Sequence, residues 1–126
     1  MEKQIINTTK APAPIGPYNQ AIKAGSMLFV SGQIALHPET NELVKTDIMA
    51  ETHQVMQNLK NILAEAGMSF ADVVKATIFI TDMNTFSDIN EVYGKYFTGN
   101  FPARETVQVA ALPKGVNVEI SVIACQ

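Results

Sequence analysis

The sequence predicts an α+β fold, in which one mixed β-sheet carries two helices on one of its faces. Two segments, from Asp47 to Ala66 and from Phe86 to Phe97, repeat apolar residues at the three-and-four spacing of an amphipathic helix. Five shorter segments are rich in the β-branched and aromatic residues that strands favour. The elements follow the order β-β-α-β-α-β-β without an internal repeat, which is typical of an α+β domain.

The bulk properties indicate a single domain over residues 1–126. The chain has 126 residues, of which 47% are hydrophobic and 17% charged, as in a globular protein with one core. Its formal net charge of −3 disfavours nucleic acid as a partner. The one cysteine, Cys125, has no partner for a disulfide, and no apolar run approaches the ~18 residues of a membrane span. We therefore expect a cytoplasmic protein without membrane contact.

The N-terminal part of the chain predicts a loop followed by a hairpin. Three prolines between Thr8 and Pro17 fix the backbone φ angle and remove backbone donors, so this segment is predicted as an ordered loop. Strands are expected at Gln20–Lys23 and Met27–Val30. The turn Ala24-Gly25-Ser26 joins them.

The middle of the chain predicts a helix, a strand and a second helix. Asp47 or the residue before it can cap the first helix, and Gly67 stands where a glycine often ends a helix. The segment Val73–Thr81 is β-branched and aromatic, so we expect a largely buried strand. Asn84 or the residue after it is the candidate N-cap of the second helix.

The C-terminal part predicts two strands, Glu105–Ala111 and Asn117–Ala124, joined as a hairpin by Leu112-Pro113-Lys114-Gly115. Successive side chains of a strand point to opposite faces, so Glu119 lies on a face that the helices do not cover. Two interpretations of this polar face remain open. It is either a solvated outer face, or a face buried against another subunit with a ligand site in it.

Arg104 and Thr106 share a face at the other candidate strand. A planar guanidinium binds a carboxylate through two parallel hydrogen bonds, which makes Arg104 a candidate for holding a small acid. A hairpin centred near Lys114 would pair Val109 with Glu119 and leave Arg104 about five residues, or ~16 Å, further along. One small ligand cannot span that distance, so we predict that Arg104 and Glu119 meet across a subunit interface.

Four stretches of the chain form a specific pattern by their order and spacing: APIGPYNQA (13–21), FVSGQI (29–34), VKATIFITDM (74–83), and FPAR (101–104) followed by VEI (118–120). Through them nearly the whole chain, from Ala11 to Ala124, resembles the Rid (reactive intermediate deaminase, YjgF-type) family. The resemblance implies a chorismate-mutase-like fold that assembles as a homotrimer with ligand clefts between subunits. It also implies hydrolysis of reactive enamines and imines, such as 2-aminoacrylate, to 2-keto acids and ammonia, with no cofactor and no metal.

At the matching positions, the resemblance implies that Arg104 binds the substrate carboxylate together with the backbone N–H of Thr106. It implies that Glu119 holds and polarises the attacking water. The other residues expected to line the cleft are Tyr18, Ser31, Gly32 and Asn90. The sequence departs from the family beside Arg104, where Glu105-Thr106 replaces the common Ser-Cys pair.

Three function classes are compatible with this pattern. The first is an imine deaminase acting on small 2-imino acids. The second is a trimeric metabolite-binding or regulatory protein that uses the same cleft without turnover. The third is a ribonuclease or translation inhibitor, which the negative net charge and the absence of a basic stripe disfavour.

Overall fold

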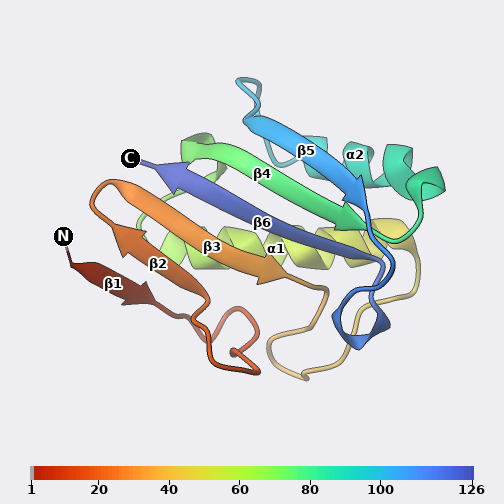
Figure 1. The fold of residues 1–126 in the computed structure, drawn as a ribbon, viewed down its shortest axis with the longest axis horizontal. Helices are drawn as coiled ribbons and strands as arrows, with labels where there is room; N and C mark the ends of the chain where they lie inside the picture. The colour runs from red at the N-terminus through yellow and green to blue at the C-terminus, as the bar shows by residue number, and fades with distance from the viewer. Residues whose placement is uncertain (1) are drawn as a thin grey trace.

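The computed structural model describes residues 2–126, which form six strands, two α-helices and three short 3₁₀ helices (Figure 1). The strands are β1 (Lys3–Ile6), β2 (Ala21–Ala24), β3 (Met27–Gln33), β4 (Val73–Ile80), β5 (Ala103–Gln108) and β6 (Val118–Cys125). The α-helices are α1 (Ile48–Glu65) and α2 (Phe86–Gly94), and the 3₁₀ helices are η1 (Phe70–Asp72), η2 (Met83–Thr85) and η3 (Pro113–Gly115).

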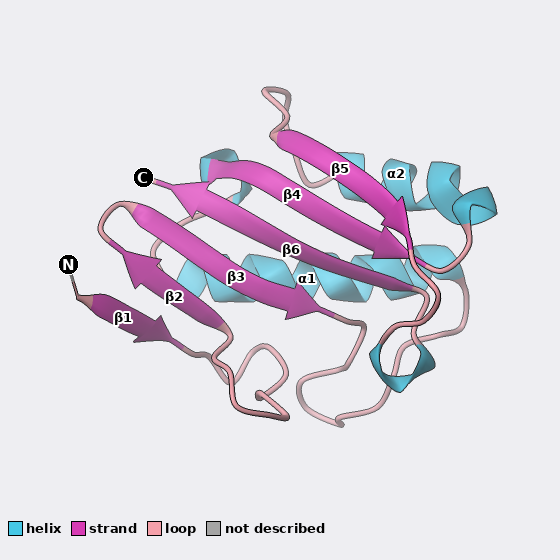
Figure 2. Cartoon of the chain, in the orientation of Figure 1, coloured by secondary structure: helices cyan, strands magenta, loops and turns pink. Residues whose placement is uncertain are grey.

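All six strands belong to one sheet with the order β1-β2-β3-β6-β4-β5. Neighbouring strands are antiparallel except β4 and β5, which run parallel. Figure 2 shows both helices on the same side of this sheet. The mixed sheet with two helices on one face confirms the predicted fold class.

The first strand, β1, is not among the elements that the sequence predicts. It pairs antiparallel with β2, and Ile6 is its one buried residue. Four residues with a single buried side chain show no alternation that a sequence pattern could reveal. The strand forms because β2 offers it a free edge.

The predicted hairpin of the last two strands is wrong. β4 lies between β5 and β6 and pairs with both, antiparallel to β6 and parallel to β5. Every second residue of β6 is buried and the strand has a partner on each side, whereas no residue of the edge strand β5 is fully buried. The strongly apolar strand therefore takes the centre of the sheet, and the distance estimate that assumed a hairpin no longer holds.

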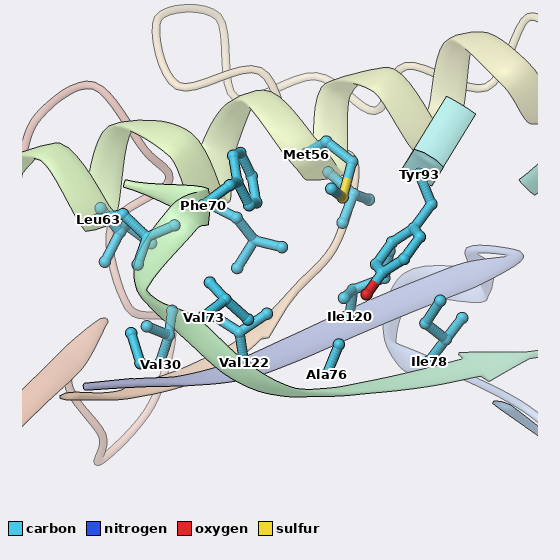
Figure 3. Close-up of a cluster of buried hydrophobic side chains, with 14 of the residues drawn as sticks. Val30, Met56, Leu63, Phe70, Val73, Ala76, Ile78, Tyr93, Ile120 and Val122 are labelled. Carbon is cyan, nitrogen blue, oxygen red and sulfur yellow. The ribbon is translucent and has the colours of Figure 1, made fainter. Parts of the chain in front are cut away.

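Helix α1 covers the middle of the sheet. The Asp47 side chain caps it by accepting from the N–H of Ala50 at 2.8 Å, and Gly67 follows its end with φ of 73°, as the sequence predicts. Figure 3 shows Met56 and Leu63 of this helix facing the strands. Both side chains are 1% exposed or less, so this interface is the core of the molecule.

Helix α2 begins at Phe86, where its apolar pattern predicts, and it ends earlier than that pattern predicts. Asp82 caps the preceding η2 by accepting from the N–H of Asn84 at 2.9 Å, and α2 follows directly and ends at Gly94. Beyond the helix, Tyr96 and Phe97 still pack against the core. The apolar side-chain pattern therefore extends beyond the end of the helix, into the residues that follow it.

Candidate functional site

A β-bulge in β3 shapes the first half of the candidate site. The pairing of β3 with β6 shifts register between Val30 and Gln33, so Ser31 and Gly32 form the bulge. The Ser31 hydroxyl donates to the carbonyl of Asn19 at 2.6 Å, and its N–H donates to the carbonyl of Gln20 at 2.9 Å. These bonds fasten the proline-rich loop to the bulge.

Gln20 anchors the proline-rich loop from the inside, a role that sequence reasoning missed. The side chain is 2% exposed, and its amide donates to the carbonyls of Thr8, Ala11 and Pro12 at 2.9–3.3 Å. Its side-chain oxygen accepts from the N–H of Thr8 at 2.7 Å. Gln20 lies within the segment 13–21 that resembles the family, which could have drawn attention to it. The sequence pattern does not show that its side chain is buried.

Tyr18 projects from this loop beside the bulge. It is 47% exposed, and its hydroxyl accepts from the N–H of Ile15 at 3.3 Å. The ring therefore presents an apolar face and a polar tip at the surface.

Glu119 of β6 lies against the bulge, on the sheet face that the helices leave open. A Cβ added at Gly32 would overlap the Glu119 carboxylate, so only glycine leaves room for that side chain. Burial raises the pKa of Glu119 above its ordinary value of 4.5. A pocket of about 360 Å³ collects these groups, and its lining is Ile15, Tyr18, Ser31, Gly32, Ile34, Pro113 and Glu119.

Arg104 of β5 forms the second half of the candidate site. Its Nη1 donates to Oδ1 of Asn90 at 2.6 Å. The guanidinium carbon lies 5.1 Å from the ring centroid of Tyr93 and 5.5 Å from that of Phe86, within cation–π range. Three side chains of α2 thus hold one cation in place beside a pocket of about 440 Å³.

Thr106 stands two residues along the same edge strand. The N–H of Val109 donates to the carbonyl of Ile80 in β4, so alternation along the strand directs the Thr106 N–H to the free edge of the sheet. The Thr106 hydroxyl is buried and has no hydrogen-bond partner. The backbone N–H of Thr106 is thus the donor that this residue presents at the sheet edge.

Glu105, the other departure from the family pattern, points away from Arg104. Its carboxylate lies 3.5 Å from the Lys75 ammonium in an exposed ion pair. The neighbouring strand thus supplies the compensating charge on the open face of the sheet.

Within one chain the two halves of the site open on opposite faces of the sheet. Ile120 pairs with Ile78, which pairs with Thr106, and both isoleucines are fully buried on the helix side. Arg104 shares the face of Thr106 because it lies two residues away. Glu119, one residue from Ile120, faces the other way. The structure therefore brings Tyr18, Ser31, Gly32 and Glu119 together, brings Arg104 and Asn90 together, and keeps the two groups apart.

Two further properties concern the part of the chain that the structure describes. Residues 2–126 contain no cluster of three or more His, Cys, Asp or Glu side chains that could hold a metal ion. Neither α-helix there combines the length and the apolar character that a membrane crossing requires.

Fold and pockets define a class of small α+β proteins built on one mixed six-stranded sheet. The model of the Endoribonuclease L-PSP family matches residues 8–126. The chain belongs to this family, which includes the Rid (YjgF-type) proteins, and the resemblance found in the sequence is confirmed.

Similar proteins of known sequence extend over almost the whole chain. A RutC family protein of Pyrococcus abyssi is 53% identical over 124 residues, which cover 98% of each chain. A 2-iminobutanoate/2-iminopropanoate deaminase of Mus musculus is 48% identical over 124 residues, covering 98% of this chain and 92% of the mouse protein.

Solved structures agree with the fold. A Rid-family protein of Yersinia pestis superposes with a TM-score of 0.96 at 49% identity, covering 99% of this chain and 100% of that one. TdcF of E. coli, solved with bound serine, superposes with a TM-score of 0.94 at 45% identity and 98% coverage of both chains.

Proposed function

We propose that this protein is a 2-iminobutanoate/2-iminopropanoate deaminase, which hydrolyses reactive imines and enamines such as 2-aminoacrylate to 2-keto acids and ammonia. The mouse relative that shares 48% of its residues carries this name. The observation that carries the proposal is the pair of pockets, one built around a fixed arginine and one around a half-buried glutamate. A small acid that must be held and attacked by water needs these two groups.

Arg104 and the N–H of Thr106 would bind the substrate carboxylate. Asn90 and the rings of Phe86 and Tyr93 already fix the guanidinium, so little side-chain freedom is lost on binding. Glu119 would accept a proton from water as the water oxygen attacks the imine carbon. Glu119 would pass that proton to the imine nitrogen, which gives a carbinolamine. The hydroxyl proton of the carbinolamine then moves to the nitrogen as the C–N bond breaks, which leaves the keto acid and ammonia.

The two pockets would form one site only between subunits of a homotrimer. Arg104 and Glu119 point to opposite faces within a chain, so one ligand reaches both only when a second chain supplies one of them. Apolar side chains on uncovered surface support such an assembly: Ile5 is 55% exposed, Phe29 45% and Val107 44%. The opposite directions of Arg104 and Glu119, and not a distance along a hairpin, thus support a site shared between subunits.

A second candidate function is metabolite binding without turnover. The E. coli structure with bound serine favours it, because serine carries a carboxylate and is not an imine. The same cleft would then sense an amino or keto acid. Loss of Arg104 would abolish binding in either case, so only turnover separates the two functions.

The test couples a serine or threonine dehydratase to the release of keto acid or ammonia and adds the protein. Wild type should accelerate release beyond the spontaneous rate, and Arg104→Ala should not. Absence of acceleration by wild type would favour the binding function. Acceleration that survives in Arg104→Ala would refute the assigned role of the arginine.

A further inference from the structure

Glu51 is a buried carboxylate to which the proposed reaction assigns no role. It lies in the first turn of α1 and is 1% exposed. Burying a carboxylate costs free energy unless a cation or hydrogen bonds replace the lost hydration. Within residues 2–126 the one ion pair joins Lys75 to Glu105, so Glu51 has no cation within ion-pair distance there. Hydrogen bonds therefore have to compensate for its burial.

Both compensating hydrogen bonds come from one residue, Asn117. Its backbone N–H donates to Oε2 of Glu51 at 2.7 Å, and its side-chain amide donates to Oε1 at 2.8 Å. The Asn117 carbonyl accepts from the N–H of Thr81, the residue that follows β4, at 3.2 Å. Asn117 is thus held by the helix on one side and by the neighbouring strand on the other.

Asn117 directly precedes β6 and lies two residues before Glu119. Val118, between the two, is fully buried, so a movement of Asn117 is not absorbed by a free side chain or a loop. The Glu119 carboxylate also has little room, since an added Cβ at Gly32 would overlap it. The position of this carboxylate therefore depends on where β6 begins.

Glu51 is coupled to Glu119 through the backbone and not through its charge. Both of its hydrogen bonds end on Asn117. Phe79 of β4 is the residue that pairs with Glu119, and Tyr18 is the other ionisable residue that lines the Glu119 pocket. Burial, and not a neighbouring charge, raises the pKa of Glu119. A change at Glu51 should therefore act on Glu119 by displacing it.

We propose that Glu51 is a positioning residue of the deaminase site, which holds Asn117, fixes the start of β6 and so keeps the Glu119 carboxylate against the bulge in β3. This inference rests on the proposed deaminase function and names a further residue on which that function depends. A displacement of about 1 Å at a reacting group can lower activity ~100-fold. Removing the hydrogen bonds of Glu51 should therefore slow hydrolysis.

The first variant is Glu51→Met, which keeps an unbranched side chain of similar length and removes both acceptors. We expect kcat/KM for 2-iminobutanoate to fall at least ~10-fold. The acid limb of the pH profile should also move down toward 4.5, because a displaced Glu119 carboxyl gains contact with water. A loss of folded protein alone would lower the activity and leave the acid limb where it is.

The assay generates 2-iminobutanoate from L-2-aminobutyrate with an L-amino acid oxidase, in the presence of catalase. Semicarbazide traps the imine that escapes the protein, so kcat/KM follows from the decrease in semicarbazone. The same reaction without the protein is the reference at each pH. Circular dichroism verifies that each variant is folded.

Glu51→Gln is the conservative variant and should recover most of the activity. Its side-chain carbonyl can accept from the Asn117 N–H, and the Asn117 amide can turn to present its oxygen to the new NH₂ group. Failure of this variant to recover activity would show that the charge of Glu51 is required, and it would overturn the positioning role.

Thr52→Val is the matched control, because it removes a buried hydrogen bond from the next residue of the same helix. The Thr52 hydroxyl donates to the carbonyl of Ile48 at 2.7 Å, within α1. Its kcat/KM and acid limb should equal those of wild type. Asn117→Ala keeps the backbone hydrogen bond to Glu51 and removes only the side-chain one, so it should show both effects of Glu51→Met to a smaller extent.

The outcomes separate this inference from the function on which it rests. Wild-type kcat/KM in folded Glu51→Met, or in Asn117→Ala if Glu51→Met does not fold, overturns the inference and leaves the deaminase function standing. A lower activity with an unchanged acid limb, or an equal loss in Thr52→Val, also overturns it. If wild type does not accelerate hydrolysis of the imine, the proposed function fails and the inference fails with it.

Discussion

At the scale of single residues, the side chains around Arg104 fix its orientation in the candidate site. Asn90 accepts from Nη1, and two aromatic rings lie over the guanidinium, so the cation has a fixed orientation before a ligand arrives. An arginine in this state presents its free N–H groups as a preformed fork. Its partner Asn90 is neutral, and the cation therefore remains available to an anion.

The variant Asn90→Asp should test this availability. The new carboxylate keeps the shape of the amide and the hydrogen bond to Arg104, but it adds a negative charge that competes with the substrate carboxylate. We expect KM to rise at least tenfold, with a smaller rise at high salt. Steady-state kinetics at two ionic strengths measure the change, and an unaltered KM would show that Arg104 does not bind the carboxylate.

Glu119 should give the activity an unusual acid limit. Burial raises the pKa of its carboxyl, and only the ionised form can accept a proton from water. The value of kcat/KM should therefore fall on acidification with an apparent pKa above 4.5. A pH–rate profile checks this, and Glu119→Gln should remove both the activity and the titration.

The same shift has a consequence for stability. A carboxyl whose pKa is raised by folding contributes stability below the ordinary carboxyl range, and this contribution is lost as the pH rises through the raised pKa. Glu119→Gln should therefore be more stable than wild type at neutral pH and show no advantage at acidic pH. Urea unfolding at both pH values provides the comparison, and an advantage confined to acid would contradict it.

Thr106 carries a stability cost of its own. Its buried hydroxyl has no partner, and an unsatisfied buried polar group costs about 1–3 kcal/mol. Thr106→Val should raise the free energy of unfolding by about 1 kcal/mol. Thr52→Val is the matched control, because the Thr52 hydroxyl donates to the carbonyl of Ile48 at 2.7 Å and its loss should destabilise. Urea midpoints of both variants test the contrast.

At the scale of elements, the bulge in β3 and the edge strand β5 place the two half-sites. The bulge brings Gly32 against Glu119, and the edge position leaves the N–H of Thr106 free. Both features interrupt the regular ladder of the sheet. The candidate functional groups thus lie where strand pairing is incomplete.

Gly32→Ala should move the Glu119 carboxylate away from the bulge in β3. The new Cβ would overlap the carboxylate and displace it from the pocket. We expect kcat to fall at least tenfold while the secondary structure measured by circular dichroism stays unchanged. Wild-type kcat in this variant would mean that the position of the carboxylate is not critical.

Local sequence patterns predict most of the helices and strands. They do not predict which strands pair with one another when these are distant in the sequence. The helix cap at Asp47 and the glycine at 67 follow from backbone chemistry within a few residues, so the sequence shows them. The neighbour of β5 depends on competition among all strands for the central positions of the sheet. The turn residues Leu112-Pro113-Lys114-Gly115 favour a hairpin locally, and the burial of β6 between two other strands overrides this preference.

The residues of the candidate site were likewise predictable only in part from the sequence. Arg104 and Glu119 were identified from a family resemblance, since alternation alone leaves both as ordinary strand residues. The buried anchor Gln20 and the contact of Glu51 with Asn117 became visible only when the chain was folded. Each depends on neighbours that are distant in the sequence, and no local pattern reports them.

At the scale of the whole molecule, one face of the sheet carries both helices and the other is uncovered. Phe29 and Ile5 are exposed, and Glu119 opens toward the uncovered side. A homotrimer would bury this apolar surface and complete the site. Light scattering should then give three times the 13.7 kDa mass of the chain.

The most direct measurement mixes two inactive variants, Arg104→Ala and Glu119→Gln, by refolding them together at equal concentration. In a cyclic trimer, about a quarter of the interfaces would combine a wild-type Arg104 from one chain with a wild-type Glu119 from its neighbour. A site shared between subunits predicts recovery of about a quarter of the wild-type deaminase activity. Activity no greater than that of the separate variants, in trimers proven to be mixed, would contradict it.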